Sequence, residues 1–414
     1  MVQSVLGSLT LGYRPLWNGA RQLAGIQLYV QDLAGSYVDA PHLLRTLQEM
    51  WSASSPPLLI SPQSRQLLLQ LLQQAPRGSP WIEVRGQWLG DSSLLEQVRQ
   101  AYRRGLRLVW RGELSDLPGG DIAACFDNSL LSLSPAEAVG ALQSSASTGQ
   151  RGVRASPILD GQMYENLPTV ALLSLCLDRH RAVAVAGWPS DDVLYSLRHQ
   201  QLQPSHATIF KLMKAIDAEQ SLDSFEHILS EDPLLAYRFL TYTNSAALGL
   251  RTGIDSLRRG LVMLGYGTLQ RWLGDQLPHA STDPNLSPIR QTMVLRAQLM
   301  ERLVEAGIEY ELRREVYLTG LLSQLDTLMD EPIATILRRL PLSERISDAI
   351  VLRSGPYAPA LQIACALETD DASVVRQLCE THEMDTESVN RALLRLLSEL
   401  HVERPRPGQP TGSR

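Results

Sequence analysis

The chain has little lysine, little cysteine and no long apolar run. Only two of its 38 basic residues are lysines, Lys211 and Lys214, and neither half of the chain carries the clustered positive charge that binding to a phosphate backbone requires. The four cysteines are scattered and form no CxxC pair, which argues against structural zinc and against a disulfide framework. No apolar run approaches the ~20 residues of a membrane span.

Signals for targeting and for common hydrolase chemistry are also absent from the sequence. The first residues lack the basic and then apolar pattern of a secretory signal peptide, so we expect a cytoplasmic protein. There is no G-x-S-x-G elbow and no phosphate-binding P-loop, and the Gly119-Gly120 turn lacks the third glycine of a dinucleotide fingerprint. The length of 414 residues favours two or three domains.

The first half of the chain alternates between strand-like and helical patterns. Amphipathic stretches separate the apolar runs, and Gly105 follows one of them, where a left-handed helix cap favours glycine. Strands separated by helices predict parallel pairing, in either a (βα)8 barrel or a doubly wound sheet. The expected strands are Ile26–Val30, Leu58–Ile60, Trp81–Val84, Leu106–Trp110, Ile122–Phe126 and Ala182–Trp188, and the expected helices include Pro41–Trp51, Ser64–Gln74 and Ser92–Arg103.

From about Leu202 the strand-like runs disappear and helix start and stop signals take over, which predicts an all-helical region. The clearest signal is Asp232 as an N-cap, with Pro233 at the first helical position, where a missing N–H costs nothing. Other expected boundaries are a helix capped by Asp223 or Ser224, a helix from Asp255-Ser256 to Gly265, and a helix from Ser287-Pro288 to Gly307.

The first half resembles EAL domains, the cyclic di-GMP phosphodiesterases. The segment LGYRPLWNGARQLAGIQLYV is similar to the first β-hairpin of that family, and VRASPILDGQMYENL with AVAVAGWP is similar to its last two strands. The resemblance spans roughly residues 5–195 and implies a (βα)8-like barrel.

The resemblance also implies a hydrolase site with two divalent metals, but the residues of this chain depart from it. Uncharged and cationic groups do not hold two hard dications. We therefore expect a degenerate barrel that is not an enzyme and has no metal or other cofactor. The family's motif glutamate falls on Gln27, its metal-binding asparagine on Ser61, its paired aspartates on Trp110-Arg111, its late glutamate near Leu159 and its phosphate-gripping arginine on Val30, and only Glu83 stands where a carboxylate belongs.

The second half resembles the HDOD family over roughly residues 200–400. The segments EDPLLAYRFLTYTNSAALGL and IDSLRRGLVMLGYGTLQRWL carry its fixed points, which are Asp232-Pro233, Asn244-Ser245 and Leu264-Gly265. HDOD domains resemble metal-dependent HD phosphohydrolases but lack their metal ligands, and no His-Asp dipeptide occurs in this chain. We expect the signature residues to be structural, with Asp232 as a cap and Asn244-Ser245 at a helix end; the alternative is contact with a ligand.

These observations predict a degenerate EAL-like barrel at residues 1–195, an HDOD domain at 200–400 and a disordered tail at 401–414. The expected function is that of a non-catalytic bacterial signalling scaffold that binds other signalling proteins, without nucleic acid or membrane insertion. The oligomeric state stays open, with a dimer as one option. Two alternatives remain, a sensor that binds a cyclic dinucleotide without cleaving it and a residual metal-dependent phosphodiesterase.

Overall fold

The computed structural model describes residues 5–32, 38–146, 156–248, 253–304 and 309–402. The chain divides into two compact units, the first of residues 1–187 with 394–414 and the second of residues 188–393. The expectation that 1–195 and 200–400 are separate domains stays a prediction. The expected disordered tail lies, from residue 403 onward, outside the described residues. Within the described residues, no helix combines the length and the apolarity needed to cross a bilayer.

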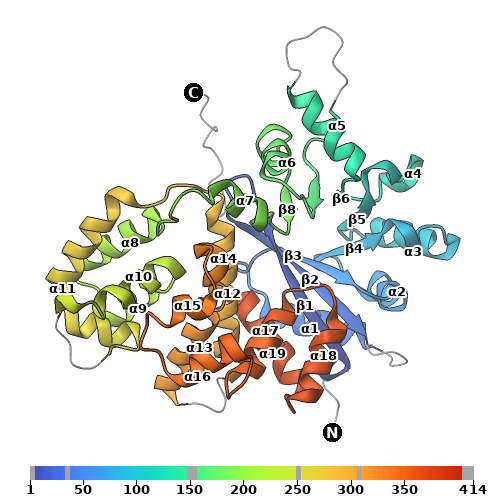
Figure 1. Ribbon diagram of the computed structural model, residues 1–414. Helices are drawn as coiled ribbons and strands as arrows, with labels where there is room; N and C mark the ends of the chain where they lie inside the picture. The colour runs from blue at the N-terminus through green and yellow to red at the C-terminus, as the bar shows by residue number, and fades with distance from the viewer. Residues whose placement is uncertain (1–4, 33–37, 147–155, 249–252, 305–308, 403–414) are drawn as a thin grey trace. The chain divides into compact units, whose positions relative to one another are not determined.

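The first unit contains a closed barrel of eight strands in sequence order, which confirms the expected barrel (Figure 1). Strand β1 (Leu9–Trp17) runs antiparallel to both of its neighbours, β2 (Leu23–Asp32) and β8 (Ala184–Ala186). All other neighbouring pairs are parallel. The remaining strands are β3 (Leu58–Pro62), β4 (Trp81–Arg85), β5 (Leu108–Glu113), β6 (Asn128–Ser132) and β7 (Met163–Glu165).

Helices connect successive parallel strands, as the crossover between parallel strands requires. Ser64 caps α2 by accepting a hydrogen bond from the amide of Leu67 at 3.1 Å, and Gly105 follows α3 with the expected positive φ of 82°. The helices of this unit are α1 (Ala40–Met50), α2 (Arg65–Gln74), α3 (Ser92–Arg103), α4 (Gly120–Ala123), α5 (Pro135–Ala146) and α6 (Val170–Ser174).

One expected strand was wrong. Residues 122–126 do not form a strand. The short helix α4 ends at Ala123, and the next strand, β6, begins at Asn128. The apolar run at this point is too short for its pattern to distinguish a strand from a helix. Most of its side chains are at least partly exposed, so the segment lies at the surface while β6 completes the barrel.

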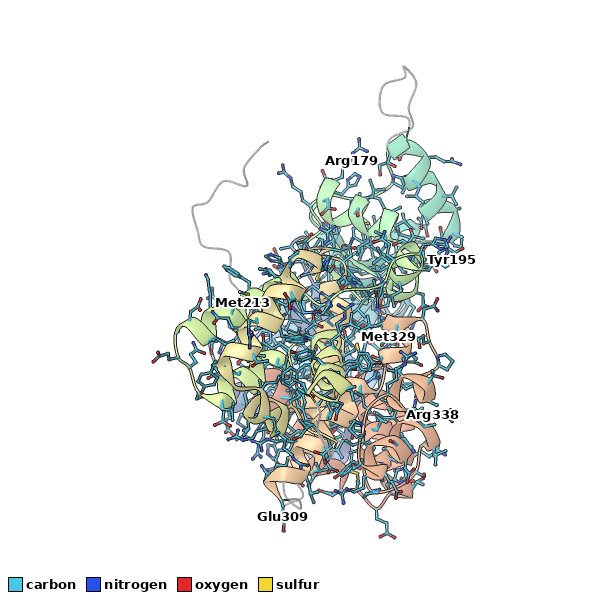
Figure 2. All side chains as sticks on the ribbon, turned by 60° about the vertical axis from the view of Figure 1, so that its left-hand side comes forward. Arg179, Tyr195, Met213, Glu309, Met329 and Arg338 are labelled. Atoms are coloured by element: carbon cyan, nitrogen blue, oxygen red, sulfur yellow. The ribbon has the colours of Figure 1, made fainter. Side chains whose placement is uncertain are left out.

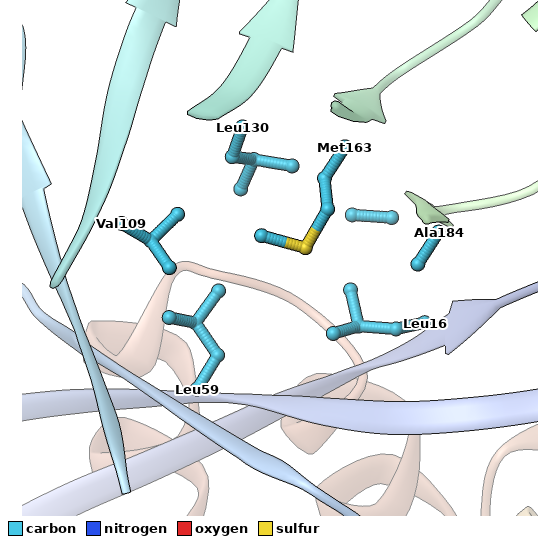
Figure 3. Close-up of a cluster of buried hydrophobic side chains, with 7 residues drawn as sticks. Leu16, Leu59, Val109, Leu130, Met163 and Ala184 are labelled. Carbon is cyan, nitrogen blue, oxygen red and sulfur yellow. The ribbon is translucent and has the colours of Figure 1, made fainter. Parts of the chain in front are cut away.

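One layer of apolar side chains from six strands fills the barrel interior (Figure 3). Alternate residues of a strand face the same side, so the residue two positions further along faces the interior as well. The layer therefore fixes which positions face the interior at the carboxyl ends of the strands. Its members are Leu16, Leu59, Val109, Leu130, Met163, Ala184 and Ala186.

The second unit is helical throughout its described residues, as expected. Its helices are α7 (Ser190–Leu197), α8 (His206–Asp217), α9 (Leu222–Leu229), α10 (Pro233–Thr243), α11 (Leu257–Gln276), α12 (Leu286–Val304), α13 (Tyr310–Leu322), α14 (Leu325–Met329), α15 (Ile333–Leu337), α16 (Glu344–Ser347), α17 (Ala358–Leu367) and α18 (Ala372–Thr381). Helix α19 (Thr386–Glu399) begins in this unit, and its residues from Leu394 onward are assigned to the first.

Two expected helix starts were wrong, and one expected helix end was right. Helix α9 is capped by Ser221, not by Asp223 or Ser224, since Ser221 accepts a hydrogen bond from the amide of Ser224. The expected helix end at Gly265 is confirmed, since the backbone of Gly265 is non-helical (φ 67°, ψ 166°) and divides α11 into two helices across a kink. Helix α12 begins at Leu286, just before the expected start. Its expected end at Gly307 lies outside the described residues.

Candidate functional site at the barrel mouth

A layer of polar side chains lies next to the apolar layer of the barrel. Several of them sit two positions beyond a core residue on the same strand, which places them in the interior one layer closer to the carboxyl ends of the strands. Carboxyl ends of barrel strands are where (βα)8 proteins build their functional sites. The layer comprises Gln27 from β2, Ser61 from β3, Glu83 from β4, Arg111 from β5 and Glu165 from β7.

Arg111 holds the layer together by binding two carboxylates. Its Nε and Nη2 each donate to an oxygen of Glu165 at 2.8 Å, which is a bidentate pair. Its Nη1 donates to Oε1 of Glu83 at 3.2 Å. Such planar, charge-assisted pairs are among the strongest hydrogen bonds in proteins. One guanidinium therefore connects three strands.

Glu83 is completely buried, with 0% of its surface exposed. Its second oxygen, Oε2, accepts hydrogen bonds from the Gln27 amide at 2.8 Å and from the Ser61 hydroxyl. The amide oxygen of Gln27 accepts in turn from the Tyr29 hydroxyl at 3.1 Å. The side chains of Glu83, Gln27, Ser61 and Tyr29 thus each have a hydrogen-bond partner, as buried polar groups require.

Charge and burial act in opposite directions on the titratable groups of this layer. Burial alone would lower the pKa of Arg111, but Glu83 and Glu165 raise it above its ordinary value. Burial raises the pKa of the Tyr29 hydroxyl. Arg14, from β1, adds a second cation, with Nη1 3.7 Å from Oε2 of Glu165. Arg111 and Tyr29 therefore keep their protons at neutral pH.

The layer does not fit the pair of divalent metals that the resemblance to EAL domains implies. Magnesium and calcium require several free oxygen ligands, mainly carboxylates. Here the four carboxylate oxygens of Glu83 and Glu165 already accept from Arg111, Gln27 and Ser61. A guanidinium beside them repels any further cation. Among the described residues, no group of three or more His, Cys, Asp or Glu side chains could hold a metal ion.

Four of the six expected barrel positions come together in this layer, and two do not. Trp110 is buried elsewhere, packed so closely on Gly86 and Gly112 that a Cβ at either glycine would lie within 2.9 Å of its ring. The reason is the strand alternation, which turns Trp110 away from the face of Arg111. Leu159 lies before β7, and its backbone N–H and C=O pair with the Tyr164 hydroxyl.

The second carboxylate of the layer is Glu165, and the sequence analysis missed it together with Tyr29. Glu165 was detectable in principle, because it follows the strand-like residues Met163 and Tyr164 at the expected end of a strand. Arg14 and Tyr29 carried no comparable signal, since only the closure of the barrel brings β1 next to Glu165.

In the second unit, Asp232 is buried with 0% exposure and has three partners from three helices. Its Oδ1 accepts from the amide of Leu235 at 2.9 Å, which is the predicted cap of α10. Its Oδ2 accepts from the amide of Ser205, the cap of α8, at 2.7 Å. Arg290 of α12 places its Nε 3.4 Å from the same oxygen. The aspartate therefore joins α8, α10 and α12.

Asn244 fixes the chain at the end of α10. Its Nδ2 donates to the carbonyls of Leu240 at 2.7 Å and Ile254 at 2.8 Å, and its Oδ1 accepts from the amide of Ile254 at 2.7 Å. A side chain with this set of bonds holds two backbone segments ten residues apart. In these contacts the Asn244 side chain bonds only to backbone atoms, which is what a structural role requires.

The second unit also carries an open hollow of about 1260 Å³. It is lined by α7, α10, α11, α14 and the segment after α14, with Tyr195 and Met329 (Figure 2) among the lining residues. Tyr195 is 63% exposed and lies under the Arg198 guanidinium at 3.7 Å. The Tyr242 and Trp272 rings stack at 5.6 Å. Tyrosine, tryptophan and arginine are the residues enriched at protein–protein interfaces.

Residues 202–329 match the model of the HDOD domain family. The chain therefore contains an HDOD domain. The domain includes Asp232 and Asn244, whose structural contacts are described above, and Ser245, which lines the hollow and has no hydrogen-bond partner for its buried hydroxyl within the described residues. For the first unit the structure supports a closed eight-stranded barrel.

Two curated proteins are similar to about half of the chain. Cyclic di-GMP phosphodiesterase CdgJ of Vibrio cholerae is 24% identical over 200 residues, which are 48% of this chain and 46% of the relative. Uncharacterized protein YuxH of Bacillus subtilis is 22% identical over 200 residues, 46% of this chain and 47% of the relative. The chain thus matches about half the length of these curated relatives.

A solved structure, that of the MmoQ response regulator from Methylococcus capsulatus, covers 47% of this chain and 98% of its own, with 16% identity and a TM-score of 0.39. That score is too low to equate the two folds.

The name of the Vibrio relative corrects one expectation. We expected that the chain is not an enzyme, because its barrel lacks the carboxylates of a two-metal site. The relative is named as a phosphodiesterase, which points to enzymatic activity. The loss of ligands at one end of a barrel was therefore too narrow a basis for excluding catalysis by the whole chain.

Proposed function

We propose that the chain takes part in cyclic di-GMP signalling and that its helical unit contributes by binding another signalling protein at the hollow. The pathway is supported by the similarity to a protein named as a cyclic di-GMP phosphodiesterase and by the HDOD domain. The mode of action is supported by one observation. The signature residues Asp232 and Asn244 bond to the domain itself, whereas the hollow presents the exposed Tyr195 ring with the Arg198 guanidinium over it.

The pathway is tested in the native cell by deleting the gene and measuring the cellular concentration of cyclic di-GMP. We expect the concentration, or the response to a raised concentration, to change on deletion and to return with the wild-type gene. An unchanged concentration together with an unchanged response would contradict the proposal.

The hollow is tested with Tyr195→Ala, because the exposed Tyr195 side chain can be removed without opening a core. A photo-crosslinking residue at position 195 captures the partner, which is then purified and titrated against the full chain. We expect Tyr195→Ala to weaken that binding about tenfold, the usual cost of a central interface tyrosine. The matched control is Tyr102→Ala, since Tyr102 is 46% exposed on α3 of the other unit. Equal affinities of wild type and Tyr195→Ala would rule out the hollow.

A second candidate function is binding of a cyclic dinucleotide at the barrel mouth. The specific observation is that the cations are more exposed than the acids. The side chains of Arg14, Arg85 and Arg111 are 18%, 23% and 15% exposed. Those of Glu83 and Glu165 are 0% and 5% exposed. A mouth with cations outermost favours anions. Calorimetric titration with cyclic di-GMP tests it, with Arg14→Ala expected to weaken binding. Chromatography of the same mixtures for the linear product measures hydrolysis directly.

A further inference from the structure

We propose that Arg111 is a built-in cation that takes the place of a divalent metal at the barrel mouth, so that its removal converts the mouth into a metal site. Arg111 lies on β5 at the position where the resemblance to EAL domains implies an aspartate. Its contacts are those that a dication would otherwise make. It binds carboxylates 28 and 54 residues away in the sequence, on β4 and β7.

The charge of the layer supports this assignment. Glu83 and Glu165 carry two negative charges in a space that is almost closed to solvent. A buried carboxylate without a cation is strongly unfavourable, and removal of one partner of a buried pair leaves that cost uncompensated. Arg111 is the cation in direct hydrogen-bonding contact with both, whereas Arg14 and Arg85 lie 3.7 and 3.8 Å from one carboxylate each.

One of the remaining side chains, Ser61, adds an uncharged oxygen of the kind that hard cations bind. The Ser61 hydroxyl and the Gln27 amide both contact Glu83, and neither carries a charge. Ser61, Glu83 and Glu165 provide oxygen ligands from three strands of the barrel, whereas Gln27 turns its amide nitrogen to Glu83 and its oxygen to the Tyr29 hydroxyl. Two carboxylates with neutral oxygens suffice for a weak magnesium or calcium site, and a third carboxylate strengthens it. What excludes a dication from the wild-type layer is the guanidinium that already holds both acids.

The test is calorimetric titration of the metal-free, full-length chain with Mn²⁺. We expect no saturable binding to the wild type and clear 1:1 binding to Arg111→Asp, at least tenfold tighter than to Arg111→Met. The binding is expected to disappear in Arg111→Asp combined with Glu83→Gln. The matched control is Arg14→Asp, which introduces the same charge change beside Glu165 but leaves Arg111 in place, and it should not bind Mn²⁺.

Folding is measured in the same samples, because the variants place unpaired acids inside the barrel. We expect the melting temperature of Arg111→Asp to rise on addition of Mn²⁺ and to fall again with EDTA, and that of the wild type to stay unchanged. Arg111→Lys keeps one positive charge and serves as a folded variant that should not gain metal affinity. The proposal is overturned if the wild type binds Mn²⁺ and loses it with Glu83→Gln, or if Arg111→Asp binds no better than the wild type or Arg14→Asp.

Discussion

The barrel and the helical unit each bury one carboxylate completely, and they pair it with different kinds of partner. Glu83 in the barrel receives side chains from three other strands, Gln27, Ser61 and Arg111. Asp232 in the helical unit receives the backbone amides of two helix starts, with Arg290 nearby. In the barrel, the buried carboxylate is stabilised by side chains that meet only because the eight strands close into a barrel. In the helical unit, the buried carboxylate is stabilised largely by backbone amides at the starts of helices.

This difference decides how each site responds to substitution. A cap depends on one acceptor oxygen, so an isosteric neutral side chain replaces much of it. A charged network depends on the balance of all its members, so loss of one member leaves the others uncompensated. The comparison predicts that the barrel layer tolerates single substitutions far less well than concerted ones, whereas the cap of α10 tolerates a conservative single substitution.

The largest effect is expected for Arg111→Met. It leaves Glu83 and Glu165 buried without their shared cation, which costs about 3–5 kcal/mol of unfolding free energy. Urea denaturation followed by circular dichroism measures it. In the triple variant that adds Glu83→Gln and Glu165→Gln the charges disappear together, and most of the lost stability should return. A triple variant less stable than Arg111→Met would show that the layer is not an electrostatic unit.

Asp232→Ala is the corresponding change in the helical unit. It removes the acceptor of the Leu235 and Ser205 amides and the partner of Arg290, and we expect a loss of about 2–3 kcal/mol. Asp232→Asn keeps the acceptor for Leu235 but loses the bond from the Ser205 amide, so we expect a smaller loss than for alanine, about 1–2 kcal/mol. If Asn and Ala are equally destabilising in thermal unfolding, the charge at this position matters as much as it does in the barrel, and the contrast fails.

A pair of glycine substitutions separates local preference from packing within the helical unit. Helix propensity favours alanine over glycine at both Gly320 and Gly274. A Cβ at Gly320 would lie 2.6 Å from the backbone Cα of Ala297 on α12, whereas one at Gly274 meets nothing within 4 Å. We expect Gly320→Ala to cost about 2 kcal/mol and Gly274→Ala to gain about 0.5 kcal/mol in chemical denaturation. Equal effects would mean that α12 and α13 are not packed as described.

The smallest effect concerns Glu315 of α13, which is less buried than either acid compared above. Burial raises its pKa, but hydrogen bonds from Arg345, Tyr357 and Ser343 outweigh this and lower it overall. A lowered folded pKa adds stability above the unfolded pKa, and that stability is lost as the pH falls through the folded value. We expect Glu315→Gln to lose about 1 kcal/mol at pH 7.

That loss should shrink as the pH falls below 4.5, the ordinary value for this group, because the wild type then loses the same contribution. Unfolding free energies of both proteins across acidic to neutral pH test this. A difference between the two that stays constant from pH 7 down to the acid limit would contradict the assigned pKa direction.

Much of the fold could be predicted because its signals are local. The alternation of apolar runs with amphipathic stretches predicted five of the eight barrel strands to within a few residues, but it placed one strand wrongly at residues 122–126 and did not give β1, β6 or β7. The Asp232-Pro233 pair predicted the start of α10 correctly. The errors fell where tertiary packing overrides a local signal. Residues 122–126 look like a strand, yet they lie at the surface and the next strand of the barrel begins only at Asn128.

The candidate site was only partly predictable for the same reason. The positions of Gln27, Ser61, Glu83 and Arg111 followed from strand order and resemblance, and the structure brings them together. Their hydrogen-bond partners did not follow. Arg111 binds Glu165, which lies 54 residues away in the sequence, whereas the analysis had expected a family position near Leu159. Sequence reasoning identified missing ligands without showing what had replaced them.

By itself, the sequence determined that this chain forms a strand-and-helix half and an all-helical half, and where most helices begin. Those features depend on residue spacing and on capping side chains within a turn or two, which a linear pattern records. Only the tertiary structure decided that an arginine would neutralise two buried acids at the barrel mouth. That outcome depends on which side chains meet when eight strands close, and a linear pattern does not contain those distances.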